Sequence, residues 1–157
     1  MTETGAVHVD HHQFLLAATT VDTTDIAAEG NLIWTGPGFV TVLTGIAYGP
    51  VTLTVAITTT PPPLDGWEQV EETVIDSRHD LRVITLDGEA PADFSPIPSG
   101  HYRVRVHARG RDSAEAGMEV TEPTETYLVT LTPTIDPVGT ITDPTDPSRP
   151  DRSARSD

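Results

Sequence analysis

The sequence predicts an all-β protein: an antiparallel β-sandwich of about eight short strands with a disordered C-terminal tail. Three observations support this prediction. Short runs rich in Val, Ile, Leu and Thr alternate between apolar and polar positions, residues that favour turns separate the runs, and helical periodicity is weak throughout. Such alternation is typical of antiparallel sheets, which bury one face and expose the other. A closed β-barrel is the alternative architecture.

Four of the expected strands lie before residue 60. They are "HHQFLLAAT" (11–19), "NLIWTG" (31–36), "GFVTVLTGIAYG" (38–49) and "VTLTVAIT" (51–58). The last of them is the clearest, because its Val, Leu and Ile residues alternate strictly with Thr or Ala. Since Tyr48-Gly49-Pro50 favours a turn, we expect the last two strands to pair as a hairpin.

A proline-rich connection, "TTTPPPLDG" (58–66), separates these strands from a second group. Its three consecutive prolines have no N–H groups for a sheet ladder, so this part of the chain must run extended. The strands expected after it are "WEQVEETVID" (67–76), "LRVITLDG" (81–88), "SGHYRVRVHARGRD" (99–112) and "ETYLVTLTP" (125–133).

From Thr134 onward the chain is rich in Pro, Asp, Ser and Thr and poor in large apolar residues. Such a segment buries too little surface to offset the entropy lost when it becomes ordered. The sequence therefore predicts a sandwich domain over residues 1–133 and a disordered tail over residues 134–157.

The composition of the 157 residues indicates the cellular compartment in which we expect the protein. The chain has no cysteine, which excludes disulfides, thiolate metal sites and cysteine nucleophiles and suits a reducing compartment. The first residues lack the basic and apolar regions of a signal peptide, and no apolar run approaches the ~20 residues of a membrane span. We therefore expect a cytoplasmic protein without a membrane span.

The formal net charge of −15 limits the kind of partner. The chain has 24 acidic residues against nine basic ones, and all nine are arginine. Because affinity for phosphate comes from a local excess of Lys and Arg, direct nucleic-acid binding is not expected. The acidic charge either serves solubility or speeds association with a basic protein partner.

The sequence offers one weak candidate for a metal site. If "HVDHH" is a strand, His8, Asp10 and His12 share one side of it and could supply three ligands. No second cluster of His, Asp or Glu follows at a spacing that would complete a site. We interpret these histidines as structural, so the prediction is that no metal is bound.

No catalytic constellation stands out. The chain has no Gly-x-Ser-x-Gly motif, no phosphate-binding glycine loop, and no carboxylate pair that differs from the many expected at this net charge. The sequence therefore predicts a protein that is not an enzyme and has no cofactor.

The strand over 99–112 carries four of the nine arginines. Its period of two places Tyr102, Val104, Val106 and Ala108 on one face. The other face is a basic stripe, made of His101, Arg103, Arg105, His107 and Arg109. We expect its arginines to pair with acidic side chains such as Glu122 or Glu125 on the strand that follows. The alternative is a surface patch for an anion or a protein partner.

Three stretches of the chain resemble the family of competence protein J, the inhibitor of the DNA-entry nuclease. The resemblance is carried by His12-Gln13-Phe14, by Pro98-Ser99-Gly100-His101-Tyr102 and by Tyr127-Leu128-Val129, in that order along residues 11–133. It implies a small β-sandwich that binds and silences a nuclease, and a protein that is not itself an enzyme.

The first functional hypothesis is therefore a nuclease inhibitor or an immunity-type protein that occludes the basic cleft of a nuclease or toxin. Charge and expected exposure select the candidate partner contacts Trp67, Glu68, Glu71, Glu72, Glu115, Glu119 and Glu122. The alternatives are a structural or accessory β-sandwich with another partner, and a metal or small-molecule binder that uses the histidine cluster. The sequence does not predict the oligomeric state.

Overall fold

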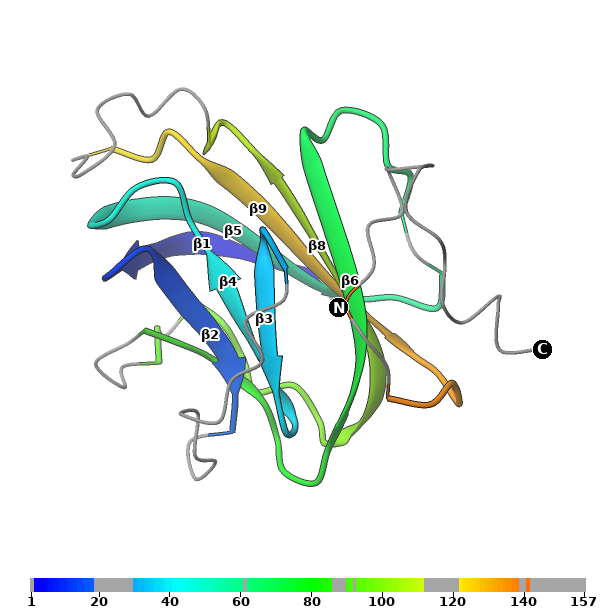
Figure 1. The fold of residues 1–157 in the computed structure, drawn as a ribbon. Helices are drawn as coiled ribbons and strands as arrows, with labels where there is room; N and C mark the ends of the chain where they lie inside the picture. The colour runs from blue at the N-terminus through cyan, green and yellow to red at the C-terminus, as the bar shows by residue number, and fades with distance from the viewer. Residues whose placement is uncertain are drawn as a thin grey trace.

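The computed structural model of the protein is a β-sandwich of two sheets (Figure 1). It describes residues 2–18, 30–60, 62–85, 90–91, 93–111, 122–138 and 141. These residues form no α-helix, and they form nine strands. The strands are β1 (Thr2–Val9), β2 (Gln13–Ala17), β3 (Ile33–Gly36), β4 (Phe39–Leu43), β5 (Gly49–Ile57), β6 (Gln69–Ser77), β7 (Arg82–Ile84), β8 (Gly100–Arg109) and β9 (Thr126–Pro133).

The two sheets are open and mostly antiparallel. The five-stranded sheet has the order β1-β5-β9-β8-β6, and the four-stranded sheet has the order β3-β4-β2-β7. Every neighbouring pair is antiparallel except β5 and β9, which run parallel. The predicted sandwich is therefore confirmed, and neither sheet closes into a barrel.

The hairpin predicted between 38–49 and 51–58 is wrong. β4 pairs with β2 and β3, whereas β5 pairs with β1 and β9 in the other sheet, so loop 44–48 crosses between the sheets. The reason is that β4 is buried on both faces. Val40 and Val42 join the main core, while Phe39 packs with Leu15 and Ile84 on the opposite side of its sheet.

β1 adds a strand that the sequence prediction omits. All eight of its residues pair with β5, from Thr2 opposite Ala56 to Val9 opposite Gly49. Only Val7 and Val9 of this strand join the core, so its apolar alternation is short. Its place at the edge of the sheet explains the weak signal, because an edge strand needs few apolar residues.

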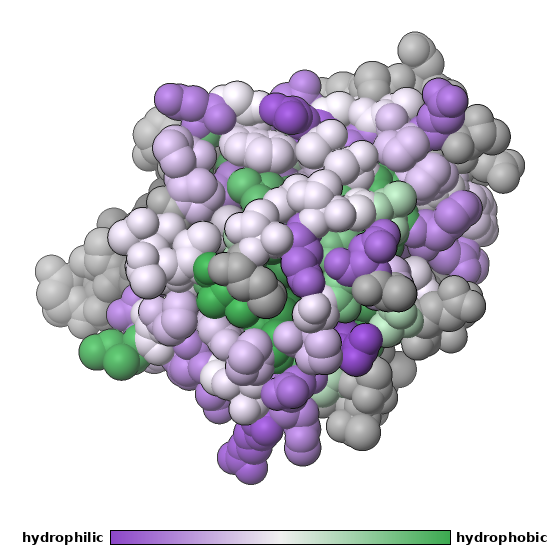
Figure 2. Space-filling model, turned by 180° about the vertical axis from the view of Figure 1, so that it is seen from behind, coloured by the Kyte–Doolittle hydropathy of each residue, from purple (hydrophilic) through white to green (hydrophobic). Residues whose placement is uncertain are grey.

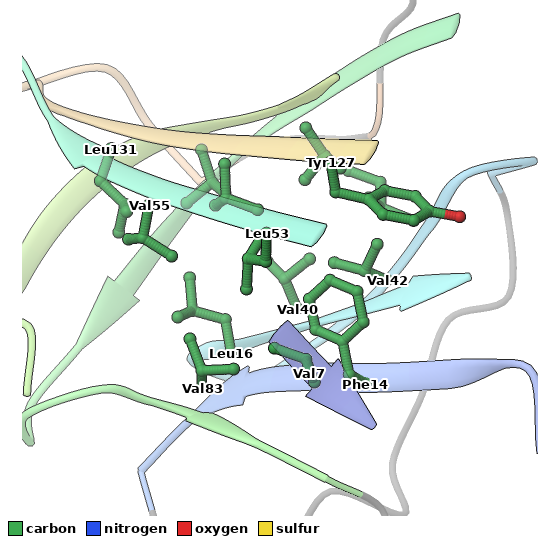
Figure 3. Close-up of a cluster of buried hydrophobic side chains, with 14 of the residues drawn as sticks. Val7, Phe14, Leu16, Val40, Val42, Leu53, Val55, Val83, Tyr127 and Leu131 are labelled. Atoms are coloured by element: carbon green, nitrogen blue, oxygen red, sulfur yellow. The ribbon is translucent and has the colours of Figure 1, made fainter. Parts of the chain in front are cut away.

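The core lies between the two sheets (Figure 3). In Figure 3, side chains of the five-stranded sheet meet side chains of the four-stranded sheet. The first group is Val7, Leu53, Val55, Tyr127 and Leu131, and the second is Phe14, Leu16, Val40, Val42 and Val83. The rings of Phe14 and Tyr127 pack edge to face, with centroids 5.8 Å apart.

Several residues after β9 contact the sandwich. The Thr134 amide donates a hydrogen bond to the His101 carbonyl at 3.1 Å. Ile141 is only 7% exposed and belongs to the main core cluster. Residues 139–140 and 142–157, which complete the predicted tail, lie outside the described residues. The domain boundary at residue 133 stays a prediction, but Thr134, Asp136 and Ile141 contact the sandwich.

Candidate partner-binding surface

The predicted alternation of the basic stripe is confirmed. Tyr102, Val104 and Val106 of β8 point into the core, and the stripe residues lie on the outer face of the five-stranded sheet. Figure 2 shows the side of the molecule that faces away from the viewer in Figure 1, where hydrophilic and near-neutral residues surround a small hydrophobic patch. The stripe borders β6 and β9, whose side chains determine its partners.

Arg103 and Arg105 of the stripe pair with acidic side chains within the protein, but not with the predicted partners. Glu72 lies directly opposite Arg105 on β6, and its carboxylate is 3.3 Å from the Arg105 guanidinium and 3.9 Å from that of Arg103. Glu125 is buried elsewhere, and no ion pair joins Glu122 to a described arginine. The reason is the register, which places Thr126, Leu128, Thr130 and Thr132 of β9 beside the stripe.

Asp136 binds two residues of the stripe from the segment after β9. Its carboxylate pairs with the Arg103 guanidinium, and its carbonyl oxygen forms a hydrogen bond with His101 Nε2. The hydrogen bond to this carbonyl is the main cause that raises the pKa of His101, and Asp76, 3.3 Å from Nδ1, adds to it. The bond with Arg103 lowers the pKa of Asp136. The ion pair with Arg103 and the hydrogen bond with His101 therefore hold Asp136 against β8.

Arg109 has no carboxylate partner among the described residues and packs on Trp67 instead. Its guanidinium carbon lies 4.8 Å from the centroid of the Trp67 ring. The same ring meets His107, with centroids 5.3 Å apart and a tilt of 51°. Trp67 is thus half-buried against the stripe, with one side of its ring engaged internally.

Loops from both sheets gather at one end of the sandwich, which we call the loop end. It consists of residues 10–13, 30–32, 44–48, 65–68, 109–111 and 122–125. It lies along the upper left and top of Figure 1, where β5, β6 and β9 begin and where β1, β4 and β8 finish. Two buried glutamates hold this end together, each bridging the two sheets.

Glu71 is the first of these glutamates, and its predicted exposure is wrong. The side chain is fully buried, and its carboxylate accepts hydrogen bonds from the amides of Asn31, Leu32 and Ile33 at 2.9–3.0 Å. The register explains this: residues 71 and 72 of β6 point to opposite faces, so Glu71 faces inward and Glu72 faces the arginines. Glu72 is also only 9% exposed, so neither residue is a free surface carboxylate.

Glu125 is the second buried glutamate and fixes loop 44–48. Its carboxylate accepts hydrogen bonds from the amides of Gly45 at 2.9 Å and Ile46 at 2.8 Å, and from the Tyr127 hydroxyl. Burial, followed by the Glu125 charge, raises the pKa of Tyr127 far above its ordinary value. A Cβ at Gly45 would lie 2.9 Å from the carboxylate, so glycine allows the close approach.

Three of the predicted partner contacts lie at the loop end. Trp67 and Glu68 precede β6, and the Glu68 carboxylate accepts a hydrogen bond from the Gly110 amide at 2.7 Å. Glu122 is exposed and lies two residues before Thr124, whose carbonyl is next to Gly110. Glu115 and Glu119 lie outside the described residues.

His8, Asp10 and His12, the weak candidates for a metal site, do not share one face of a strand in the structure. β1 ends at Val9, and His11 and His12 form a tight turn with φ of 54° and 63° before β2 begins. His8 therefore lies on a strand while His12 lies on a turn, where Nδ1 is 3.3 Å from the Thr44 carbonyl. The described ranges hold no group of three His, Cys, Asp or Glu placed to bind a metal.

The same turn contains an exposed pair that the sequence analysis missed. His11 Nδ1 is 2.8 Å from the Asp10 carboxylate, and its ring packs edge to face on Tyr48 at 5.5 Å. Tyr48 is 42% exposed, one of the few large apolar side chains at the described surface. The signal in the sequence was His11-His12, two polar residues between the runs that form β1 and β2, which is the length of a tight two-residue turn.

The described ranges contain no helix with the length and hydropathy of a membrane span. One shallow hollow of about 410 Å³ lies beside β1, lined by Ala6, His8, Thr85, Ala90 and Pro91. Among the described residues that line this hollow, His8 alone is titratable.

No family model and no curated protein matches the sequence. Two solved structures share its fold. One is ComJ from Bacillus subtilis, an inhibitor of the DNA degrading activity of NucA, with a TM-score of 0.57, 8% identity, and coverage of 84% of this chain and 96% of ComJ. The other is the product of crocagin biosynthetic gene J, with a TM-score of 0.54, 14% identity, and coverage of 85% and 97%. At these identities the likenesses show the fold alone, which is the fold that the sequence resemblance implied.

Proposed function

We propose that this protein is a non-catalytic, protein-binding inhibitor of a nuclease or a related toxic enzyme. The observation that carries the proposal is the fold shared with ComJ, which extends over nearly the whole of that inhibitor. An inhibitor needs a rigid surface that fits an enzyme and no catalytic groups of its own. The sandwich supplies such a surface at its loop end, where the two buried glutamates fix the loops.

The negative charge supports a basic partner. A nuclease presents positive charge to its substrate, so an acidic inhibitor approaches its cleft faster than a neutral one. The described acidic residues do not all contribute equally, because Glu71, Glu72 and Glu125 are buried and engaged internally. We therefore place the contact at Trp67, Glu68 and Glu122 on the loop end, with Glu115 and Glu119 on the chain between β8 and β9.

The test is a pull-down followed by an activity assay. Tagged protein is incubated with an extract of its host, and the retained proteins are assayed for DNA and RNA cleavage with and without added excess of the protein. We expect a basic nuclease to be retained and its activity to fall in proportion to the bound protein. The proposal is contradicted if the retained proteins have no nuclease activity, or if added excess of this protein leaves their nuclease activity unchanged.

Charge reversal locates the surface once a partner is in hand. Glu68→Lys with Glu122→Lys should slow association by roughly tenfold at low salt and reduce its salt dependence, because both side chains are exposed at the loop end. The matched control is Asp80→Lys with Asp93→Lys, the same charge change on exposed residues away from the loop end. Equal association rates for the two variants would show that the partner binds elsewhere than at the loop end.

The second candidate is an accessory protein that binds a partner without inhibiting it. The product of crocagin biosynthetic gene J, which shares the fold, favours this role because it is named for a biosynthetic pathway. The same pull-down distinguishes the two: an accessory protein retains a partner whose activity it does not lower. In either role we place the protein in the cytoplasm, in keeping with a chain that has no cysteine.

A further inference from the structure

The connection between β5 and β6 lies against the outer face of the five-stranded sheet. The Thr58 amide donates a hydrogen bond to the Leu131 carbonyl at 3.0 Å, and Arg105 Nη1 donates to the Pro62 carbonyl at 3.4 Å. At its far end, Trp67 packs on His107. The Thr58 bond extends the ladder between β5 and β9, and the contacts of Pro62 and Trp67 place two points of the connection against outward-facing side chains of β8.

His107, beneath this connection, is a buried imidazole with a single hydrogen bond. Nδ1 lies 3.1 Å from the Leu128 carbonyl, which can only accept, so Nδ1 carries the proton. Nε2 is buried and has no partner among the described residues. The neutral ring therefore leaves only an acceptor lone pair unpaired at Nε2, whereas a proton added there would place a positive charge and a donor in a buried site without an acceptor.

The surroundings of His107 oppose a positive charge. On β8, Arg105 and Arg109 flank it on the same face, and Val70 of β6 and Leu128 of β9 lie opposite it. The carboxylates on the adjoining elements are Glu72 on β6, engaged by arginines, Glu68, engaged by Gly110, and the exposed Asp65. Burial, and to a smaller extent Arg105, lowers the pKa of His107.

We propose that His107 and Trp67 form an acid-sensitive latch, which holds the connection on the sheet while His107 is neutral and releases Trp67 when His107 is protonated. Release lets water reach the imidazolium, whose charge is opposed by burial while the connection is closed, and it also frees Arg109 from its stacking on the same indole ring. The latch acts through contacts within this chain and does not depend on the partner proposed above. Because Trp67 is one of the proposed contacts, acidification would also change that surface.

Tryptophan fluorescence tests the latch directly. The chain has two tryptophans, so Trp34→Phe leaves Trp67 as the single indole reporter. We expect its emission to shift reversibly to the red as the pH falls below about 6.5, the ordinary histidine value, because the ring moves from a half-buried site into water. The far-UV circular dichroism should stay constant over the same range, since the sheets remain folded.

Two variants on the Trp34→Phe background identify the group that titrates. His107→Gln should abolish the red shift, and His101→Gln, the matched change on the same face of β8, should leave it in place. The proposal is overturned by emission that stays constant from about pH 8 to about pH 5, by a shift that survives His107→Gln, or by a simultaneous loss of the β-sheet signal.

A third measurement serves if His107→Gln does not fold. The imidazole of His107 is titrated by NMR in the Trp34→Phe protein, where no histidine is replaced. Its midpoint should coincide with the midpoint of the fluorescence change. Two separate midpoints would show that another group moves Trp67, and the latch would be rejected.

Discussion

Two histidines of the same strand, His101 and His107, lie in environments that favour different protonation states: the pKa of His101 is raised and that of His107 is lowered. His101 is half-exposed and has the Asp136 carbonyl and the Asp76 carboxylate as acceptors for both of its ring nitrogens. His107 is buried, has one acceptor, and lies near Arg105. Position on the basic stripe therefore does not determine the charge of a histidine, whereas the available acceptors do.

His101 yields a prediction at this scale. Since its pKa is raised in the folded protein, its contribution to the free energy of unfolding is fully present below the unfolded value of about 6.5. That contribution is lost as the pH rises through the raised folded value. We expect urea unfolding between about pH 6 and about pH 9 to show a decline in stability that His101→Gln removes.

The control for this prediction is His79→Gln, which replaces an exposed histidine in the turn after β6. It should retain the decline of the unmodified protein. A decline that is equally steep in His101→Gln would show that another group, and not the contact with Asp136, causes it.

At the scale of elements, the two sheets are joined by carboxylates as well as by apolar packing. Glu71 on β6 receives three amides from the start of β3, and Glu125 before β9 receives two amides from the loop after β4. Glu71 lies in the five-stranded sheet and Glu125 lies directly before its strand β9, and the amide donors of both glutamates lie at or next to strands of the four-stranded sheet. These bonds fix the position of loops that have few apolar side chains of their own.

Glu71→Gln tests this role. The substitution keeps the shape of the side chain but removes its charge and one acceptor oxygen for the three amides. We expect the free energy of unfolding in urea to fall by about 1.5–3 kcal/mol. Glu68→Gln, an exposed carboxylate with one amide partner, should cost less than about 1 kcal/mol. Equal losses in the two variants would mean that burial of Glu71 adds nothing.

The sequence predicted the element types better than their partners. All eight expected strands occur, because period-two alternation and turn residues are local properties. The hairpin between 38–49 and 51–58 failed because β4 buries both faces, and a local pattern does not tell which sheet a doubly buried strand joins. Glu71 was misjudged for a related reason: which face of β6 turns inward depends on its pairing with β8.

At the scale of the whole molecule, the ordered structure extends beyond the last strand. Asp136 is bound by Arg103 and His101, and Ile141 is buried in the core cluster. In the same segment, Ile135 and Val138 are exposed large apolar side chains. The segment after β9 thus contributes both to the sandwich and to its surface.

Two truncations test where the folded unit ends. Removal of residues 142–157, which are rich in Pro, Asp, Ser and Arg, should change the free energy of unfolding by less than about 0.5 kcal/mol. Removal of residues 134–157 also deletes Ile141, and burial of such a side chain contributes about 1.5–3 kcal/mol. Urea unfolding of both variants provides the measurement. If the longer deletion costs no more than the shorter one, the domain ends at residue 133.

The central position of β9 has a consequence for synthesis of the chain. β9 is the last strand that the structure describes, yet it lies between β5 and β8 and joins the β1-β5 pair to the β8-β6 pair. Before residues 126–133 leave the ribosome, those two pairs have no strand between them, and the edges of β5 and β8 are open to other chains. The five-stranded sheet can therefore be completed only after residues 126–133 have been synthesised, and a nascent chain that pauses before β9 is the form most exposed to aggregation.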